Sequence, residues 1–379
     1  MLEESDTIGA AGGVVRGSKS GANTQATAYS FGTLGRGTTL WQALLVAAAG
    51  LSVGACGSEQ APTEPRAPAH GGPLAAAVGA ANTWVMRAAE PFGLCEISAD
   101  LAVDAAGRST VYTFGGTICN EGGDVESLDA YDVTTDTWRD VGSALGASMN
   151  GIGKIGNKFY YSGGISFGGG SEATTFQTVA FVFDANRFIR KADLPKASSG
   201  GVTGVIKNKI YVLPGLCDGD RFPDPRSCAE ELIRTLFRYD PVTNTWATLA
   251  EAPHNHNHGA GGVIDHKFYV AGGGSNTSPR TATLDVYDPA TNIWKTLAPM
   301  PGAAPVVGAV VRNKLLVSPG AGALWSYDPV TNVWKTKRGP TFSHEAASRV
   351  MIDGKAYLLA VGGSHDGFTV PNPSELYTP

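Results

Sequence analysis

Hydrophobic and polar residues alternate in short runs over most of the chain after residue 80. In the stretch that ends at Trp294 the runs are GAGGVID, HKFYVAGG, TLDVYDP and NIWKTLA, and they are interrupted by Gly, Asn, Asp and Pro. Alternation with a period of two is typical of strands that bury one face, and the interrupting residues are typical of tight turns. The stretch therefore predicts an antiparallel sheet of four short strands.

This four-strand pattern recurs, and the segment joining its third and fourth strands is nearly the same each time. It reads YDVTTDTW from Tyr131, YDPVTNTW from Tyr239, YDPATNIW from Tyr287 and YDPVTNVW from Tyr327. A degenerate copy, FVFDANRF, offers Phe183-Asp184 as the Tyr-Asp pair and Phe188 in place of the Trp. A unit of short strands cannot bury its own apolar face, so the copies must pack on one another in a closed array.

A Gly-Gly pair closes the second strand in four of the units, at residues 115–116, 163–164, 272–273 and 362–363. Pro-Gly stands at this position in the other two units. The Gly pair, the Tyr-Asp pair and a Trp six positions after the Asp together resemble the kelch repeat, whose units are the blades of β-propellers. Counting the second strands in this way predicts six blades.

The sixth unit lacks a fourth strand, because the sequence stops at ELYTP. We predict the missing strand at the other end of the repeats, in AANTWVMRAAEP around Trp84. An N-terminal strand that pairs beside the C-terminal one joins the ends of the ring and leaves no open edge. The sequence thus predicts an all-β fold, a six-bladed kelch-type β-propeller over residues 80–379, closed by an N-terminal strand that completes the last blade.

Composition changes sharply before the repeats. Residues 1–39 are rich in Gly, Ser, Thr and Ala without an apolar period, which predicts disorder. Residues 40–56 carry an apolar run, shorter than the ~20 residues of a spanning helix, that ends in Val-Gly-Ala-Cys and resembles a bacterial lipobox. Residues 57–79 indicate a flexible linker. We expect a signal segment, lipidation at Cys56 and a membrane-anchored lipoprotein outside the cytoplasm, in the outer membrane, at the cell surface or in the periplasm.

The remaining four cysteines form two local pairs along the sequence, Cys95 with Cys119 and Cys217 with Cys228. An even number at short separation suits disulfides in an oxidising compartment. No Cys-x-x-Cys spacing favours a metal instead. The net charge of −5 is mild and no block of Lys or Arg occurs, so nucleic acid is not expected as a partner.

Long loops between second and third strands, and the segments leading from one blade to the next, gather on one face of the predicted ring. The segment His254-Asn255-His256-Asn257-His258 lies there, and Glu96 is placed nearby. Aligning the blades on their first strands gives His344 the position of His256. The candidate ligand-binding residues on this face are His254, His256, His258, His344, Glu345, Arg349, His365 and Asp366.

Imidazoles beside a carboxylate could bind a sugar, hold a divalent metal or move a proton, since His titrates near neutral pH. A solvated turn whose side chains cap the backbone is the other interpretation of the His-Asn alternation. The repeats occupy nearly all of the sequence after the linker, which leaves no extra domain to hold a cofactor. We therefore assign no metal and no cofactor to this face.

Kelch-like propellers include both enzymes and adaptors, so the resemblance alone does not decide the function. No hydrolase elbow, phosphate loop, nicotinamide fingerprint or HExxH helix occurs in the sequence. We expect a binding module that recognises a glycan or a protein through the loop-rich face. Length, six blades and export also resemble secreted bacterial sialic-acid mutarotases, which implies a cofactor-free sugar mutarotase as the alternative.

Overall fold

The computed structural model describes residues 78–104, 107–119, 125–144, 151–166, 173–218, 228, 231–275, 278–364 and 370–379. Every regular element in these ranges is a β-strand, as the alternating pattern predicts. Within the same ranges no helix is long and apolar enough to cross a membrane. Cys56, His365 and Asp366 lie outside the described residues, as does most of the predicted linker, so lipidation and the membrane anchor stay predictions.

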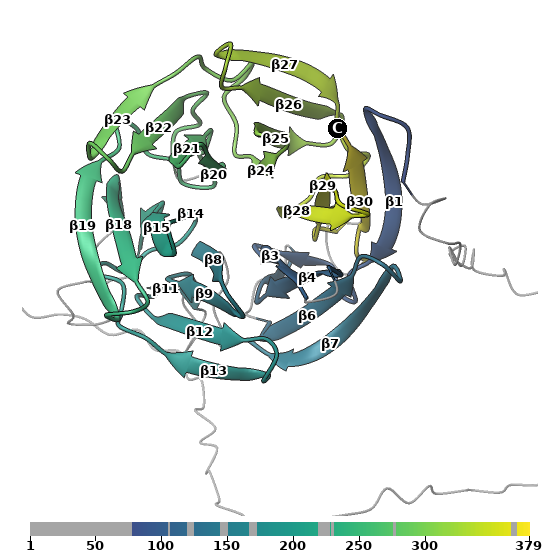
Figure 1. Cartoon of the computed structure of the whole chain (residues 1–379), viewed down its shortest axis with the longest axis horizontal. Coiled ribbons are helices and arrows are strands. Elements are labelled where there is room, and N and C mark those ends of the chain that lie inside the picture. Colours follow the sequence, from purple (N-terminus) through teal and green to yellow (C-terminus); the bar gives the residue numbers. More distant parts are fainter. Residues whose placement is uncertain are drawn as a thin grey trace, which may run out of the picture. The chain divides into compact units, whose positions relative to one another are not determined.

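Six four-stranded antiparallel sheets surround a central axis and form the blades of a ring (Figure 1). The first strand of each blade lies nearest the axis. Blade 1 comprises β3 (Ser98–Val103), β4 (Ser109–Phe114), β6 (Ser127–Asp132) and β7 (Thr137–Ser143). Blade 2 comprises β8 (Gly151–Ile155), β9 (Lys158–Ser162), β12 (Thr178–Val182) and β13 (Arg187–Arg190). Blade 3 comprises β14 (Val202–Ile206), β15 (Lys209–Leu213), β18 (Thr235–Asp240) and β19 (Thr245–Glu251).

The second half of the ring has the same order of strands. Blade 4 comprises β20 (Ala260–Ile264), β21 (Lys267–Ala271), β22 (Leu284–Asp288) and β23 (Ile293–Thr296). Blade 5 comprises β24 (Val307–Val311), β25 (Lys314–Gly320), β26 (Ala323–Asp328) and β27 (Val333–Arg338). Blade 6 comprises β28 (Ala346–Ile352), β29 (Lys355–Val361), β30 (Pro373–Thr378) and β1 (Thr83–Ala89). The predicted number of blades is confirmed.

Neighbouring blades bury the middle strands of each sheet on both faces. All five residues of β12 in blade 2 are buried, and so are four of the five residues of β21 in blade 4. The outermost strand is less covered, and in β23 only Trp294 is partly shielded from solvent. The apolar core therefore lies between blades, which explains why one repeat cannot be stable by itself.

The N-terminal strand closes the ring as predicted. Strand β1 pairs antiparallel with β30, and Trp84 lies opposite Tyr377. The hydroxyl group of Tyr377 donates a hydrogen bond to the side-chain oxygen of Asn82 at 2.7 Å. The last blade is thus assembled from residues almost three hundred positions apart, and it reproduces the Tyr and Trp pairing of the other blades.

The repeated Tyr, Asn and Trp residues form a hydrogen-bonded link to the preceding blade. In blade 4, the Asn292 side-chain oxygen accepts a bond from the Tyr287 hydroxyl at 2.7 Å and one from the backbone N–H of Ala250 at 3.1 Å. The indole N–H of Trp294 donates to the carbonyl of the same Ala250 at 2.9 Å. Asn292 itself has a φ of 56°, in the left-handed region that Asn and Asp tolerate best after Gly. Each repeat therefore fastens its outer strands to the blade before it.

Replacing this asparagine tests how much the link contributes to stability. We expect Asn292→Ala to lower the free energy of unfolding by about 2–3 kcal/mol, because it removes two hydrogen bonds and puts alanine at a positive φ. Asn292→Asp is expected to cost less than about 1 kcal/mol, since Asp136 already accepts the equivalent bonds in blade 1. Denaturant-induced unfolding of both variants measures the difference, and equal losses would contradict this role.

The predicted alignment of the degenerate repeat was wrong by two residues. In blade 2 it is Phe181 that lies opposite Phe188 and takes the place of the tyrosine, whereas Phe183 follows the end of β12. The two phenylalanines are two residues apart, so in a strand both point to the same face. The alternation of polar and apolar residues therefore cannot show which of them replaces the tyrosine. The Asn186 side chain donates to the carbonyl of Val141 in blade 1 at 3.1 Å, so a link between blades persists without the tryptophan.

The glycine pairs allow close approach where the second strand ends. Gly272 and Gly273 have φ angles of 67° and 123°, which favour glycine. A Cβ atom on Gly272 would lie 2.7 Å from the Met300 side chain and 2.9 Å from the carbonyl of Ala304. The kelch glycines are therefore required both by backbone conformation and by packing against the next segment.

Both predicted disulfides are present. Cys95 in β2 (Leu94–Cys95) is bonded to Cys119, which follows β5 (Thr117–Ile118), and these two short strands pair with each other. The second bond joins Cys217 in β16 (Leu216–Cys217) to Cys228. Two further short strands pair in the loops, β17 (Glu231–Leu232) with β16, and β11 (Ala173–Thr174) with β10 (Ile165–Ser166). Disulfides of this kind indicate an extracytoplasmic protein.

Candidate functional site

A cavity of about 920 Å³ occupies the centre of the ring, where the first strands of all six blades form its wall. Most of the wall is made of Gly, Ala and Val residues. Its carboxyl and basic side chains, together with His258, fall into two levels. Glu96, His258 and Glu345 precede the first strands at one mouth, and Asp100, Lys154 and Arg349 lie within those strands. The channel therefore combines a small-residue wall with a few charged groups, as ligand sites commonly do.

Two glutamates meet at the junction between blades 6 and 1. The backbone N–H of Glu96 donates to the Glu345 carboxylate at 3.2 Å. Glu96 has a φ of 61°, and the disulfide at Cys95 precedes it directly. Burial raises the pKa of Glu345, although the bond from Glu96 and the nearby His344 oppose that effect. The mouth thus holds a carboxyl group that is protonated more readily than an ordinary surface glutamate.

Asp100 lies one level further along the wall. Burial raises its pKa to about 6, although a bond from the Leu101 backbone N–H and the charge of Lys154 act in the opposite direction. The ammonium group of Lys154 lies 5.8 Å from the centre of the Phe183 ring, a cation–π contact that steadies it. This carboxyl can therefore exchange a proton near neutral pH.

His258 also faces the channel. Its backbone has a φ of 58°, and its N–H donates to the carbonyl of Gly200 in the preceding blade at 3.0 Å. Burial lowers the pKa of the His258 imidazole, so the ring is neutral at neutral pH. A neutral imidazole offers one hydrogen-bond donor and one acceptor to a ligand in the channel.

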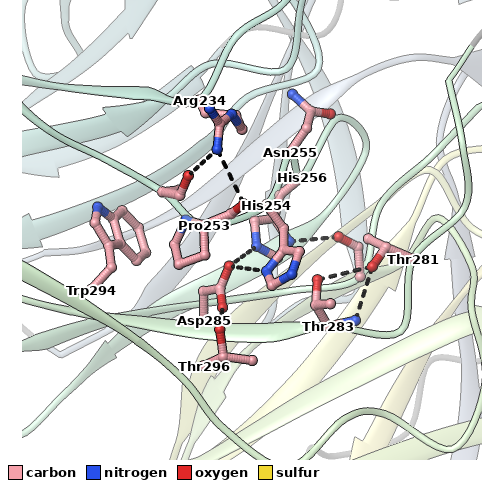
Figure 2. Close-up of polar contacts among 12 residues, drawn as sticks. Arg234, Pro253, His254, Asn255, His256, Thr281, Thr283, Asp285, Trp294 and Thr296 are labelled. Atoms are coloured by element: carbon pink, nitrogen blue, oxygen red, sulfur yellow. Dashed lines mark hydrogen bonds and ion pairs between the residues drawn. The ribbon is translucent and has the colours of Figure 1, made fainter.

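His256, in contrast, holds the blade together. Figure 2 shows His254 and His256 both directed at the carboxylate of Asp285. His256 is 1% exposed, with one ring nitrogen 2.7 Å from the carbonyl of Gly272 and the other 3.1 Å from the Asp285 carboxylate. Both ring nitrogens are thus engaged by oxygens of the same blade, which fastens the segment before β20 to the ends of β21 and β22.

The charge state of Asp285 agrees with this geometry. Burial would raise its pKa, but hydrogen bonds from His256, Thr296 and His254 outweigh burial and lower the pKa. The carboxylate is therefore ionised and paired with the buried ring. His254, whose side chain is 41% exposed, binds the same carboxylate from the solvent side.

His344 repeats this arrangement in blade 6. Its ring nitrogens lie 3.2 Å from the carbonyl of Gly362 and 3.0 Å from the Glu375 carboxylate. Burial would raise the pKa of Glu375, but bonds from His344 and from the backbone of Thr341 and Phe342 lower it. His344 and His256 thus occupy equivalent places, as their alignment suggested. Two extra residues, Asn257 and His258, form a turn in blade 4 that blade 6 lacks.

The structure divides the candidate residues by position. Those that line the central channel are His258, Glu345, Arg349 and the buried His344. His254 and His256 lie in blade 4 against Asp285, and direct contact with a ligand would require His256 to break both of its bonds. The part of the chain that the structure describes has no group of three His, Cys, Asp or Glu residues placed to hold a metal.

Two charged residues of the channel were not among the candidates. Asp100 lies in the first strand of blade 1 and Lys154 in the first strand of blade 2. At the aligned positions the other blades carry mainly Gly, Val and Ala. A charged residue at a position that is small or apolar in most of the other copies was the available signal. Aligning the first strands of all six copies would have found them.

Comparison with known proteins agrees with the repeat pattern. The sequence profile of the kelch motif matches residues 197–253 and 257–301, which contain blades 3 and 4. No curated protein sequence matches the chain. A solved structure titled "Structure of YjhT" is similar at 15% identity with a TM-score of 0.59, and the match covers 76% of this chain and 95% of that one. At this identity the likeness shows the fold alone.

Proposed function

Since this chain is a kelch-repeat β-propeller, a fold that serves binding and interaction, we propose that it binds a glycan in its central channel. The ligand enters at the mouth formed by Glu96, His258 and Glu345. The observation that carries the proposal is the cavity of about 920 Å³ with acidic, basic and imidazole groups around its wall. A cavity of this size accommodates a ligand of one to a few sugar rings.

The chemistry of the wall suits a ligand rich in hydroxyl groups. Carboxylates such as Glu345 and Asp100 accept hydrogen bonds from hydroxyls, while Lys154 and Arg349 donate them. Each of these groups is attached to a first strand or directly precedes one, so the scaffold holds it in place. Glycine and alanine between them let the sugar ring approach the backbone.

The depth of the polar groups favours a glycan over a protein partner. Asp100, Lys154 and Arg349 lie within the first strands, inside the channel rather than on its rim. A folded protein surface would contact the rim, whereas a saccharide can reach the level of these three side chains. A partner that contacted only the rim would leave these three charged side chains without a role in binding.

The titration behaviour of the same groups favours a second function, cofactor-free mutarotation of a sugar. Opening and closing a sugar ring needs one group that gives a proton and one that takes it. Asp100, with a pKa of about 6, is a carboxyl suited to proton exchange near neutral pH, and burial raises the pKa of Glu345 as well. His258 adds a neutral imidazole.

Binding to a glycan array, followed by calorimetry with the best saccharide, tests the proposal. We expect Glu345→Gln and Asp100→Asn each to weaken binding by about tenfold or more, because each replaces a charged acceptor in the channel. Asp353→Asn is the matched control, since this exposed carboxylate in the β28–β29 turn does not line the cavity. Polarimetry of the same saccharide decides between binding alone and mutarotation.

Two outcomes would overturn the proposal. One is a saccharide affinity that is the same in the two channel variants as in the wild type. The other is saturable binding of a protein with no saccharide bound. Loss of mutarotation in Asp100→Asn with binding retained would instead move the enzymatic function to first place.

A further inference from the structure

A second cavity, of about 530 Å³, opens beside the inner strands of blades 4, 5 and 6 at their hairpin ends. Three basic residues line it: Arg312, Arg349 and Lys355. The other lining residues are Val263, Val310, Asn313, Met351, Gly354 and Ala356, so no carboxylate belongs to this wall. Basic groups gathered in a concavity whose lining carries no Asp or Glu side chain attract anions.

Arg349 departs from the repeat at this place. The strand registers put it in the same ring of positions as Leu101, Val205, Val263 and Val310, and Lys154 of blade 2 is the other charged member. No described residue forms an ion pair or hydrogen bond with the Arg349 guanidinium. Packing does not explain an exposed arginine where four blades place an aliphatic side chain.

Lys355 departs from the repeat as well. In blades 3, 4 and 5 the lysine that begins the second strand forms an ion pair with the aspartate after the repeated tyrosine, as Lys267 does with Asp288 at 2.7 Å. In blade 6 the β28–β29 hairpin is longer by two residue pairs, which moves Lys355 two residues beyond that position. Thr378 stands where the aspartate would be, and the described residues offer Lys355 no acidic partner.

Arg312 completes the group from blade 5. One of its N–H groups donates to the main-chain oxygen of Pro379 at 2.9 Å, and its guanidinium lies 6.0 Å from the centre of the Tyr357 ring. These contacts orient the side chain and leave its other N–H groups available. Asp353 is the acidic residue of the same β28–β29 turn, but it does not line the cavity.

We propose that this second cavity binds a tetrahedral oxyanion, a sulfate or phosphate group, between Arg312, Arg349 and Lys355. Guanidinium groups bind such oxygens through paired N–H donors, and a lysine ammonium adds a point charge. Three positive charges match a doubly charged group better than a single carboxylate. The proposal concerns a different cavity and ligand from the glycan site. Val263, Val310 and Arg349 line both cavities, and Arg349 is the one charged residue among these three.

Calorimetry at low ionic strength with inorganic sulfate, inorganic phosphate and a sulfated disaccharide tests the site. We expect saturable binding that Lys355→Gln and Arg312→Gln each weaken by about tenfold. Lys267→Gln is the matched control, because it removes the same charge from a lysine that is paired with Asp288. Binding of the free ions indicates an inorganic ligand, and binding of the disaccharide alone indicates an ester group on a saccharide.

The proposal is overturned if none of the three probes saturates, or if Lys267→Gln weakens binding as much as Lys355→Gln does. Circular dichroism confirms that each variant is folded. The two sites also fail independently. Glu345→Gln should leave sulfate binding unchanged, and Lys355→Gln should leave glycan binding in the central channel unchanged.

Discussion

Removal of residues 375–379 is expected to abolish the cooperative unfolding transition of the propeller. Strand β30 lies between β29 and β1, so its loss separates two ladders at once and leaves β1 without a partner. Tyr377 is fully buried, and Glu375 holds His344 as well as the backbone of Thr341 and Phe342. These losses together exceed the ~5–15 kcal/mol that stabilises a typical domain.

Thermal unfolding followed by circular dichroism measures this effect. Tyr377→Phe is the control, because it removes only the hydroxyl bond to Asn82 and should cost about 1 kcal/mol. A truncated protein that still unfolds cooperatively within a few degrees of the full chain would show that closure by β1 and β30 is not needed. Blade 6 would then be an accessory to a ring that five blades stabilise.

The second large effect is expected from Glu90, a carboxyl group buried between blades 6 and 1. It is 1% exposed, and one of its oxygens accepts a bond from the Thr113 hydroxyl at 2.6 Å. Its other oxygen has no hydrogen-bond partner among the described residues. Glu90 stands six residues after Trp84, the repeated tryptophan of its blade. Six residues after the equivalent Trp or Phe, four other blades carry a buried apolar residue: Ala144, Leu194, Ala252 and Met300.

This position makes the stability of the ring fall as the pH rises. Burial raises the pKa of Glu90 to about 8, the Thr113 bond opposes this, and Asp129 adds to it. A carboxyl whose pKa is raised from 4.5 to about 8 is neutral in the folded protein at pH values where the unfolded chain is ionised. Stability is therefore fully present below pH 4.5 and declines up to pH 8, by roughly 5 kcal/mol in total.

Glu90→Gln tests this, since glutamine keeps an acceptor for Thr113 and carries no charge. We expect its melting temperature to equal or fall below that of the wild type at pH 5 and to exceed it by roughly 10 °C at pH 9. Glu251→Gln is the control, because that side chain is 60% exposed and should show no such change with pH. A difference between Glu90→Gln and wild type that does not grow with pH would refute the buried charge.

Much of the fold could be predicted because the repeat makes each local signal appear several times. Tyr, Asn and Trp recur at fixed spacing, and each has a contact in the structure that needs that spacing, such as Tyr287 with Asn292 and Trp294 with Ala250. The error at Phe183 arose where the repeat is degenerate and two phenylalanines, two residues apart, could each replace the tyrosine. Only the strand register, with Phe181 opposite Phe188, separates them.

The candidate site was predicted less completely, because its residues are defined by where side chains point. The histidine pattern led to His256 and His344, which the structure buries against Asp285 and Glu375. It also led to His258, which faces the channel. Local sequence does not distinguish these orientations, because neighbouring residues of one turn can face opposite sides.

The sequence alone determined the number of blades, the strand that closes the ring and the two disulfides, since these depend on spacing along the chain. Tertiary structure alone decided which charged groups share a cavity. Asp100 with Lys154, and Lys355 with Arg312 and Arg349, come from different blades or different strands, and only closure of the ring brings them together. Burial, which sets the protonation of Glu90 and Glu345, likewise exists only once the blades have packed.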